Sequence, residues 1–119
     1  MSLLTKEQLL QARPLPVEVV FVPEWSGDVR VQGLSAGEAD AFNASLVRQI
    51  HGKAQFDREH YCAKLLSRCL VNEKGERVLT EGEMLALSGQ SAIPVYRLTA
   101  VAERLSGLQP QAVEDAAKN

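Results

Sequence analysis

The chain has 119 residues, with 13 Lys and Arg against 15 Asp and Glu and a formal net charge of −2. This length is that of one ordinary domain. The composition, with 45% hydrophobic and 24% charged residues, is typical of a globular protein with its own core. No apolar run approaches the ~20 residues of a membrane span, which excludes a transmembrane helix. The basic residues are scattered among acidic ones, which argues against binding nucleic acid by phosphate neutralisation.

The cysteines indicate the compartment. Cys62 and Cys69 are seven residues apart in one helical pattern, or roughly 10 Å along a helix axis. A disulfide needs Cα atoms within about 7 Å, so these two cannot pair inside a helix. Free thiols suit a reducing compartment, and the N-terminal residues lack the basic start and long apolar stretch of a signal peptide. We therefore expect a cytoplasmic protein.

The first elements predicted along the chain are a short helix and a hairpin. Thr5 to Ala12 is expected to be helical, with Thr5 as its N-cap, before two prolines impose extended backbone. The segments VEVVFVPEW and VRVQGL then flank Ser26-Gly27-Asp28, which predicts a β-hairpin with a three-residue turn. In that register Glu24 lies opposite Arg30, as a cross-strand ion pair.

Apolar residues fall on both faces of this hairpin. One face is expected to turn toward a core and carries Val17, Val19, Phe21, Trp25, Val29 and Val31. Val20 and Val22 fall on the opposite side. Either helices cover both faces, or one face and an edge are left for a partner, since exposed apolar patches usually mark contact sites. As candidate partner-binding residues we take Val20, Val22 and Trp25.

After the hairpin the apolar period changes to about 3.6, and alternating start and stop signals predict about five short helices. The first expected helix is capped at Ser35, carries Ile50 and ends at Gly52, and the second runs from Asp57 to Leu70. A short third helix is capped at Thr80 and ends at Gly89, and the fourth is capped at Ser91 and ends at Gly107. The last expected helix starts at Pro110. The predicted fold is therefore α+β and predominantly helical, an N-terminal β-hairpin followed by these helices in a single domain. That domain spans residues 1–119, with the hairpin region at 14–34, a helical body at 35–107 and a C-terminal helix or tail at 108–119.

The sequence contains no arrangement of reactive side chains that is typical of an enzyme, so we predict that the protein is not an enzyme. The soft metal ligands are His51, His60, Cys62 and Cys69, and no C-x-x-C or H-x-x-x-H pair exists among them. Neither thiol lies at a predicted helix N-terminus, where its pKa would fall. Glu81 and Glu83 belong to a capping box. No glycine-rich phosphate loop is present. We expect no cofactor, no metal and no small-molecule substrate.

One alternative points to DNA. The segment TEGEMLALSGQSAIPVYRLTAVAERL has the outline of a helix-turn-helix, with Gly89 in the turn. Its second helix would carry only Arg97 and Arg104 as basic residues, and a groove-reading helix needs base-contacting side chains near its N-terminus. A small DNA-binding regulator using the region around Gly89 is thus the alternative hypothesis.

The order of these segments resembles the tail assembly chaperones of long-tailed, siphovirus-type bacteriophages and prophages. The resembling segments are LLTKEQLLQA, VEVVFVPEWSGDVRVQGL, ASLVRQ, CLVNEKGERVLTEGEMLALSGQSA, RLTAVAERLSGL and the ending KN, which together span nearly the whole chain. Asn72 departs from the pattern, where an acidic residue is expected, and Pro94 and Val95 stand where such sequences are often simple Ala-rich helix.

The resemblance implies a role and partners. Such proteins bind the tape-measure protein, recruit the major tail (tube) protein and are absent from the finished virion. In several phages a longer form is made by frameshifting. Tube subunits expose strand edges before they polymerise, and a hairpin edge is a surface that could cover them. The resemblance leaves self-association open and implies neither nucleic acid nor membrane as a partner.

Overall fold

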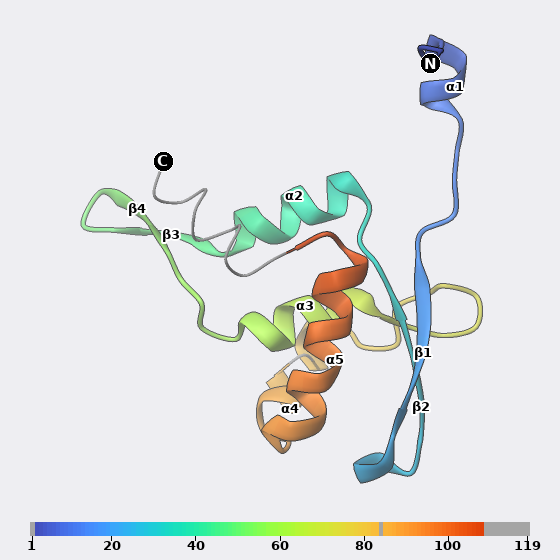
Figure 1. Ribbon diagram of the computed structural model, residues 1–119. Coiled ribbons are helices and arrows are strands. Elements are labelled where there is room, and N and C mark those ends of the chain that lie inside the picture. Colours follow the sequence, from blue (N-terminus) through green and yellow to red (C-terminus); the bar gives the residue numbers. More distant parts are fainter. Residues whose placement is uncertain (1, 84, 109–119) are drawn as a thin grey trace.

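The computed structural model of the protein describes residues 2–83 and 85–108 (Figure 1). It is a small α+β domain, as the sequence predicts. Its elements in chain order are α1 (Lys6–Leu10), β1 (Val17–Val22), the 3₁₀ turn η1 (Pro23–Trp25), β2 (Gly27–Gln32), α2 (Ala36–Ser45), β3 (Val47–Ile50), β4 (Lys53–Phe56), α3 (Tyr61–Cys69), β5 (Leu70–Val71), η2 (Glu81–Glu83), α4 (Leu85–Ser88) and α5 (Ala92–Leu105).

The first hairpin is confirmed, but its predicted register is wrong. β1 and β2 are antiparallel, with Val22 opposite Gly27 and Val19 opposite Arg30. The connection is the turn η1 followed by Ser26, whose φ of 53° is left-handed and whose N–H donates to the Pro23 carbonyl. The three residues before Ser26 therefore belong to the turn, and Glu24 does not face Arg30. The proline favours this turn because its ring presets the φ of a first turn residue.

The helix capped at Ser35 ends earlier than predicted. Ser35 accepts a hydrogen bond from the Glu38 N–H at 3.2 Å and the Glu38 carboxylate accepts one from the Ser35 N–H at 2.9 Å, so the capping box is confirmed. The helix nevertheless stops at Ser45, and a second hairpin follows, formed by β3 and β4. His51 and Gly52 form its two-residue turn with φ values of 53° and 77°, the conformation that a tight hairpin turn demands. Ile50 consequently lies in a strand.

A short third strand extends the first sheet. α3 begins at Tyr61, later than the predicted Asp57, and leads directly into β5, which pairs with β2. The sheet order is β1-β2-β5. The turn after β5 is the predicted one: the Gly75 N–H donates to the Asn72 carbonyl at 3.0 Å, and Gly75 has a φ of 80°.

The last described helix is the central one of the fold. α5 starts at the predicted cap, Ser91, which accepts from the Ile93 N–H, and Gly107 follows its end with a φ of 71°. The predicted last helix, starting at Pro110, lies outside the described residues. Four α-helices follow the first hairpin within the described chain, and α1 precedes it. None of the described helices is long and apolar enough to cross a membrane.

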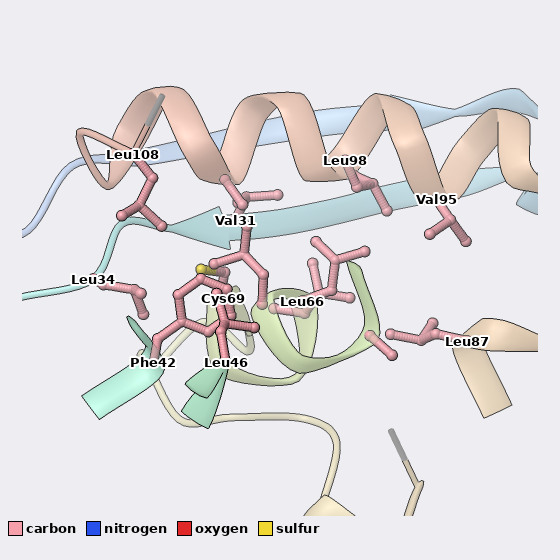
Figure 2. Packing of buried hydrophobic residues seen from close by; sticks show 14 of the residues in the cluster. Val31, Leu34, Phe42, Leu46, Leu66, Cys69, Leu87, Val95, Leu98 and Leu108 are labelled. Carbon is pink, nitrogen blue, oxygen red and sulfur yellow. The ribbon is translucent and has the colours of Figure 1, made fainter. Parts of the chain in front are cut away.

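The core lies between α5, α3, α2 and the inner face of the sheet. Figure 2 shows Val95 and Leu98 of α5 directed toward Leu66 of α3 and Leu87 of α4. The buried apolar residues are Val22, Val31, Leu34, Phe42, Leu46, Ala63, Leu65, Leu66, Cys69, Leu70, Leu87, Val95, Leu98, Ala102 and Leu108. At the end of β2 the backbones approach closely, because a Cβ on Gly33 would lie 2.4 Å from the Leu105 carbonyl oxygen.

Candidate protein-interaction surface

The structure reverses the two faces of β1. Val22 is fully buried and Val20 packs against the core, so the prediction that they lie on the outer side is wrong. The side chains that turn away from the core are Val17, Val19 and Phe21, which are 37%, 57% and 60% exposed. On β2, Val31 is buried as predicted. Of the three candidate partner-binding residues, Trp25 alone has substantial exposure, at 36%.

Two ion pairs join the inner side of the hairpin to α5. α5 lies along the inner side of the hairpin (Figure 1), and its Arg104 pairs with Glu18 at 2.5 Å. Its Arg97 makes a two-pronged contact with Glu24, with nitrogen–oxygen distances of 2.6 and 3.0 Å. The two arginines are seven residues apart and so lie on one side of the helix. Glu18, the one acidic residue of β1, shares the helix-covered face with Val20 and Val22, and Arg104 is the cation that pairs with it there.

The Glu24–Arg97 contact predicts a measurable titration. The Arg97 guanidinium lowers the pKa of Glu24 from 4.5 to about 2. Because the pKa is lower in the folded chain, this carboxylate stabilises the fold above pH 4.5 and loses its contribution as the pH falls toward 2. Arg97→Gln should move the Glu24 midpoint back toward 4.5, as followed by side-chain carboxyl NMR.

Arg104→Gln is the matched control, because it removes the other ion pair of the same helix face. It should leave the pKa of Glu24 at about 2. A midpoint that stays near 2 in Arg97→Gln as well would show that the guanidinium is not the cause.

The outer face of the hairpin borders a groove of about 720 Å³. Val19 lies on one side of it and the Asn72–Glu76 turn on the other. The turn is held by the Asn72 amide oxygen, which accepts from the N–H groups of Lys74 and Glu76 at 2.9 and 3.0 Å. The lining residues are Val19, Asp28, Arg30, Val71, Asn72, Glu73, Lys74 and Glu76. The groove thus combines an apolar strip with charges of both signs.

Arg30 is one of the two cations that line this groove, with Lys74. Its Nε atom is buried and has no hydrogen-bond partner within the described chain. A buried donor without a partner carries a desolvation cost that an incoming acceptor would relieve. A carboxylate or carbonyl oxygen of a bound protein is an acceptor of that kind.

The N-terminal arm adds a second apolar surface. α1 lies away from the body of the protein at the end of an extended segment (Figure 1). Thr5 caps it through a complete capping box with Gln8. The leucines of this arm are exposed: Leu3, which precedes α1, is 95% exposed, and Leu10, at the end of α1, is 73% exposed. A five-residue helix has little stability by itself, so the arm is suited to docking against another surface.

Trp25 lies at the tip of the hairpin beside a smaller depression. This pocket has a volume of about 360 Å³, and Leu79 and Leu87 line it together with Trp25. Val78, which is 52% exposed, borders the adjoining pocket. Apolar side chains are therefore exposed at the tip of the hairpin as well, next to the edge of the core.

Within residues 2–83 and 85–108, the thiol of Cys69 is buried and the imidazole of His60 lies at the surface. Burial raises the pKa of the Cys69 thiol to about 11, so it carries no thiolate at neutral pH. His60 lies 3.3 Å from the Ser88 hydroxyl and 3.4 Å from a Glu59 oxygen, but all of these contacts are open to water. Among the described residues no three His, Cys, Asp or Glu side chains converge on a possible metal position.

The geometry of α5 bears on the DNA-binding alternative. This helix packs against α3 on one side and the first hairpin on the other. Both basic side chains that would contact phosphates are engaged by Glu18 and Glu24. α4, the supposed first helix of the motif, has four residues. The exposed side of α5 carries Ile93, Tyr96, Ala100 and Arg104. A recognition helix reads the groove with polar and basic side chains, and the one basic residue on this exposed side is paired with Glu18.

Sequence reasoning missed the exposed strip of β1, the Arg30 groove and the second hairpin. The signal that identifies the covered face was present: Glu18 shares a face with Val20 and Val22, and α5 carries two arginines one heptad apart.

Comparisons of the chain with protein-family models, curated proteins and solved structures found no match.

Proposed function

We propose that this chain is a tail assembly chaperone of long-tailed bacteriophages, which binds the tape-measure protein and recruits tail-tube subunits in the host cytoplasm. The order of its sequence segments supports the family, and one structural observation supports the binding role. Val19 and Phe21, neighbours on the outer face of β1, are more than half exposed beside an open groove. A transient binder needs such a surface and needs no cofactor.

The outer face suits a helical client. A tape-measure protein is a long helix, and an amphipathic helix docks by placing an apolar stripe along an apolar strip. The strip on β1 runs from Val17 to Phe21, and the groove beside it is lined by the cations Arg30 and Lys74 and by the carboxylates Glu73 and Glu76. Charges of both signs at the rim favour a specific orientation of the bound helix.

Co-expression with the tape-measure and tube proteins encoded in the same genome tests this proposal. The tagged chain should retain the tape-measure protein, and Val19→Glu with Phe21→Glu should lower that recovery at least about tenfold, since two charges would replace the centre of the strip. Ile93→Glu is the matched control, because Ile93 is 65% exposed on α5, away from this face. It should bind like the unmodified chain.

Two outcomes would overturn the proposal. One is an unmodified chain that retains neither client, and the other is a doubly substituted chain that stays folded and binds normally. The DNA-binding alternative is tested on the same purified protein. A DNA-binding regulator would retard duplex DNA in a gel at low salt, and its affinity for DNA would fall steeply as the salt concentration rises. For this chain we expect no retardation.

A further inference from the structure

One edge of β1 has free hydrogen-bonding groups. In the sheet order β1-β2-β5, β1 is outermost, and no described strand pairs with its other side. The Gly33 N–H donates to the Pro16 carbonyl at 2.8 Å, which sets the phase of the ladder. Alternate residues bond to β2, so the N–H and C=O groups of Val17, Val19 and Phe21 point to the free edge.

The same three residues carry the exposed apolar side chains of β1. Edge strands of soluble proteins are commonly protected by a lysine, a bulge or a proline within the strand. β1 has none of these between its ends, and prolines stand only at its borders, as Pro16 and Pro23. The one charge within β1, Glu18, lies on the inner side, where it pairs with Arg104 of α5. The outward-facing side of this edge is apolar, and such an edge is a template for another strand.

We propose that the strand added to this edge is β1 of a second copy of the chain, antiparallel, with Val19 opposite Val19 across a twofold axis. Val17 of each copy then lies opposite Phe21 of the other. Each outward-facing residue exchanges an N–H and a C=O with its counterpart, so the free groups of both edges are satisfied. A twofold contact needs a self-complementary surface, and the outward-facing side of β1 supplies one because Val17 and Phe21 flank Val19 symmetrically.

The neighbouring registers are disfavoured by the residues they bring together. A shift toward the N-terminus centres the pairing on Glu18 and sets two carboxylates directly opposite each other, which is destabilising. A shift toward the C-terminus brings Pro23 opposite Val17, where proline has no N–H to donate. In the proposed register Glu18 lies opposite Val20 of the second copy and keeps its contact with Arg104.

This pairing uses backbone groups and leaves the outer side chains accessible. The apolar strips of the two copies would join into one continuous surface across the joined sheets. The inference does not rest on the proposed client, because it concerns the purified chain alone.

The test compares Val19→Pro with Val19→Thr by light scattering after gel filtration, at concentrations up to about 1 mM. The unmodified chain and Val19→Thr, which keeps the N–H, should approach twice the monomer mass as concentration rises. Val19→Pro loses the central donor of both copies, so we expect its dimer to be at least about tenfold weaker. The fold itself does not use this donor, so circular dichroism of Val19→Pro should match that of the unmodified chain.

A second measurement needs no variant. In a mixture of isotope-labelled and unlabelled chains, the proposed register gives an intermolecular nuclear Overhauser effect between the Hα atoms of Glu18 and of Val20 in the other copy. A chain that stays monomeric throughout, a folded Val19→Pro with unchanged association, or a dimer without this contact would each overturn the proposal.

Discussion

Val22→Glu is expected to destabilise the protein strongly, whereas Phe21→Glu, one residue earlier, should leave its stability almost unchanged. Val22 is fully buried in the core and Phe21 is 60% exposed. A carboxylate at position 22 would lose its hydration without a cation to receive it, because Arg97 and Arg104 are already paired with other carboxylates. The expected cost is more than about 3 kcal/mol, a large share of a small domain's stability.

Urea unfolding followed by circular dichroism measures this difference directly. Phe21→Glu should change the free energy of unfolding by no more than about 0.5 kcal/mol, as exposed substitutions usually do. Since the two positions are adjacent, differences in local strand propensity are small beside the effect of burial. Equal destabilisation at both positions would contradict the orientation of the hairpin described here.

Phe42→Ala is expected to have the second large effect, lowering the free energy of unfolding by about 3–5 kcal/mol. Phe42 is fully buried and attaches α2 to α3. Its ring meets that of Tyr61 edge-on, with centroids 5.4 Å apart, and the Arg68 guanidinium lies 5.7 Å from its centre. Truncation to alanine would leave a cavity in the part of the core that α2 covers.

Asp40→Ala on the exposed side of the same helix is the control, and it should shift stability by less than about 0.5 kcal/mol. Amide hydrogen exchange adds a local readout, because α2 should lose protection in Phe42→Ala more than α5 does. A destabilisation below about 1 kcal/mol would show that the ring does not hold α2 in place.

Local chemistry made much of the helical part predictable. Thr5, Ser35 and Ser91 cap helices where the sequence predicts, because each side-chain oxygen satisfies an N–H that the helix itself leaves unpaired. Gly75 and Gly107 adopt the positive φ expected at a turn and at a helix end. The buried stripe of α5 follows the helical period, since one side of this long helix meets the core.

The strands beyond the first hairpin were not predictable in the same way. VRQI and KAQF form β3 and β4 although the preceding residues continue a helical period, because the His51-Gly52 turn holds two left-handed conformations. Histidine gives only a weak signal for that conformation. β5 is two residues long and is held by its pairing with β2 and by a bridge between Val71 and Arg77.

The surface available to partners depended on the tertiary structure most of all. By itself the sequence determined that β1 is a strand with apolar residues on both faces, and that helices with defined caps follow it. Which face is covered depends on α5, more than 70 residues later in the chain, where Arg97 and Arg104 receive Glu24 and Glu18. Strand periodicity separates the two faces but does not say which one is buried. That choice belongs to long-range packing and ion pairing, which leave Val17, Val19 and Phe21 on the outside.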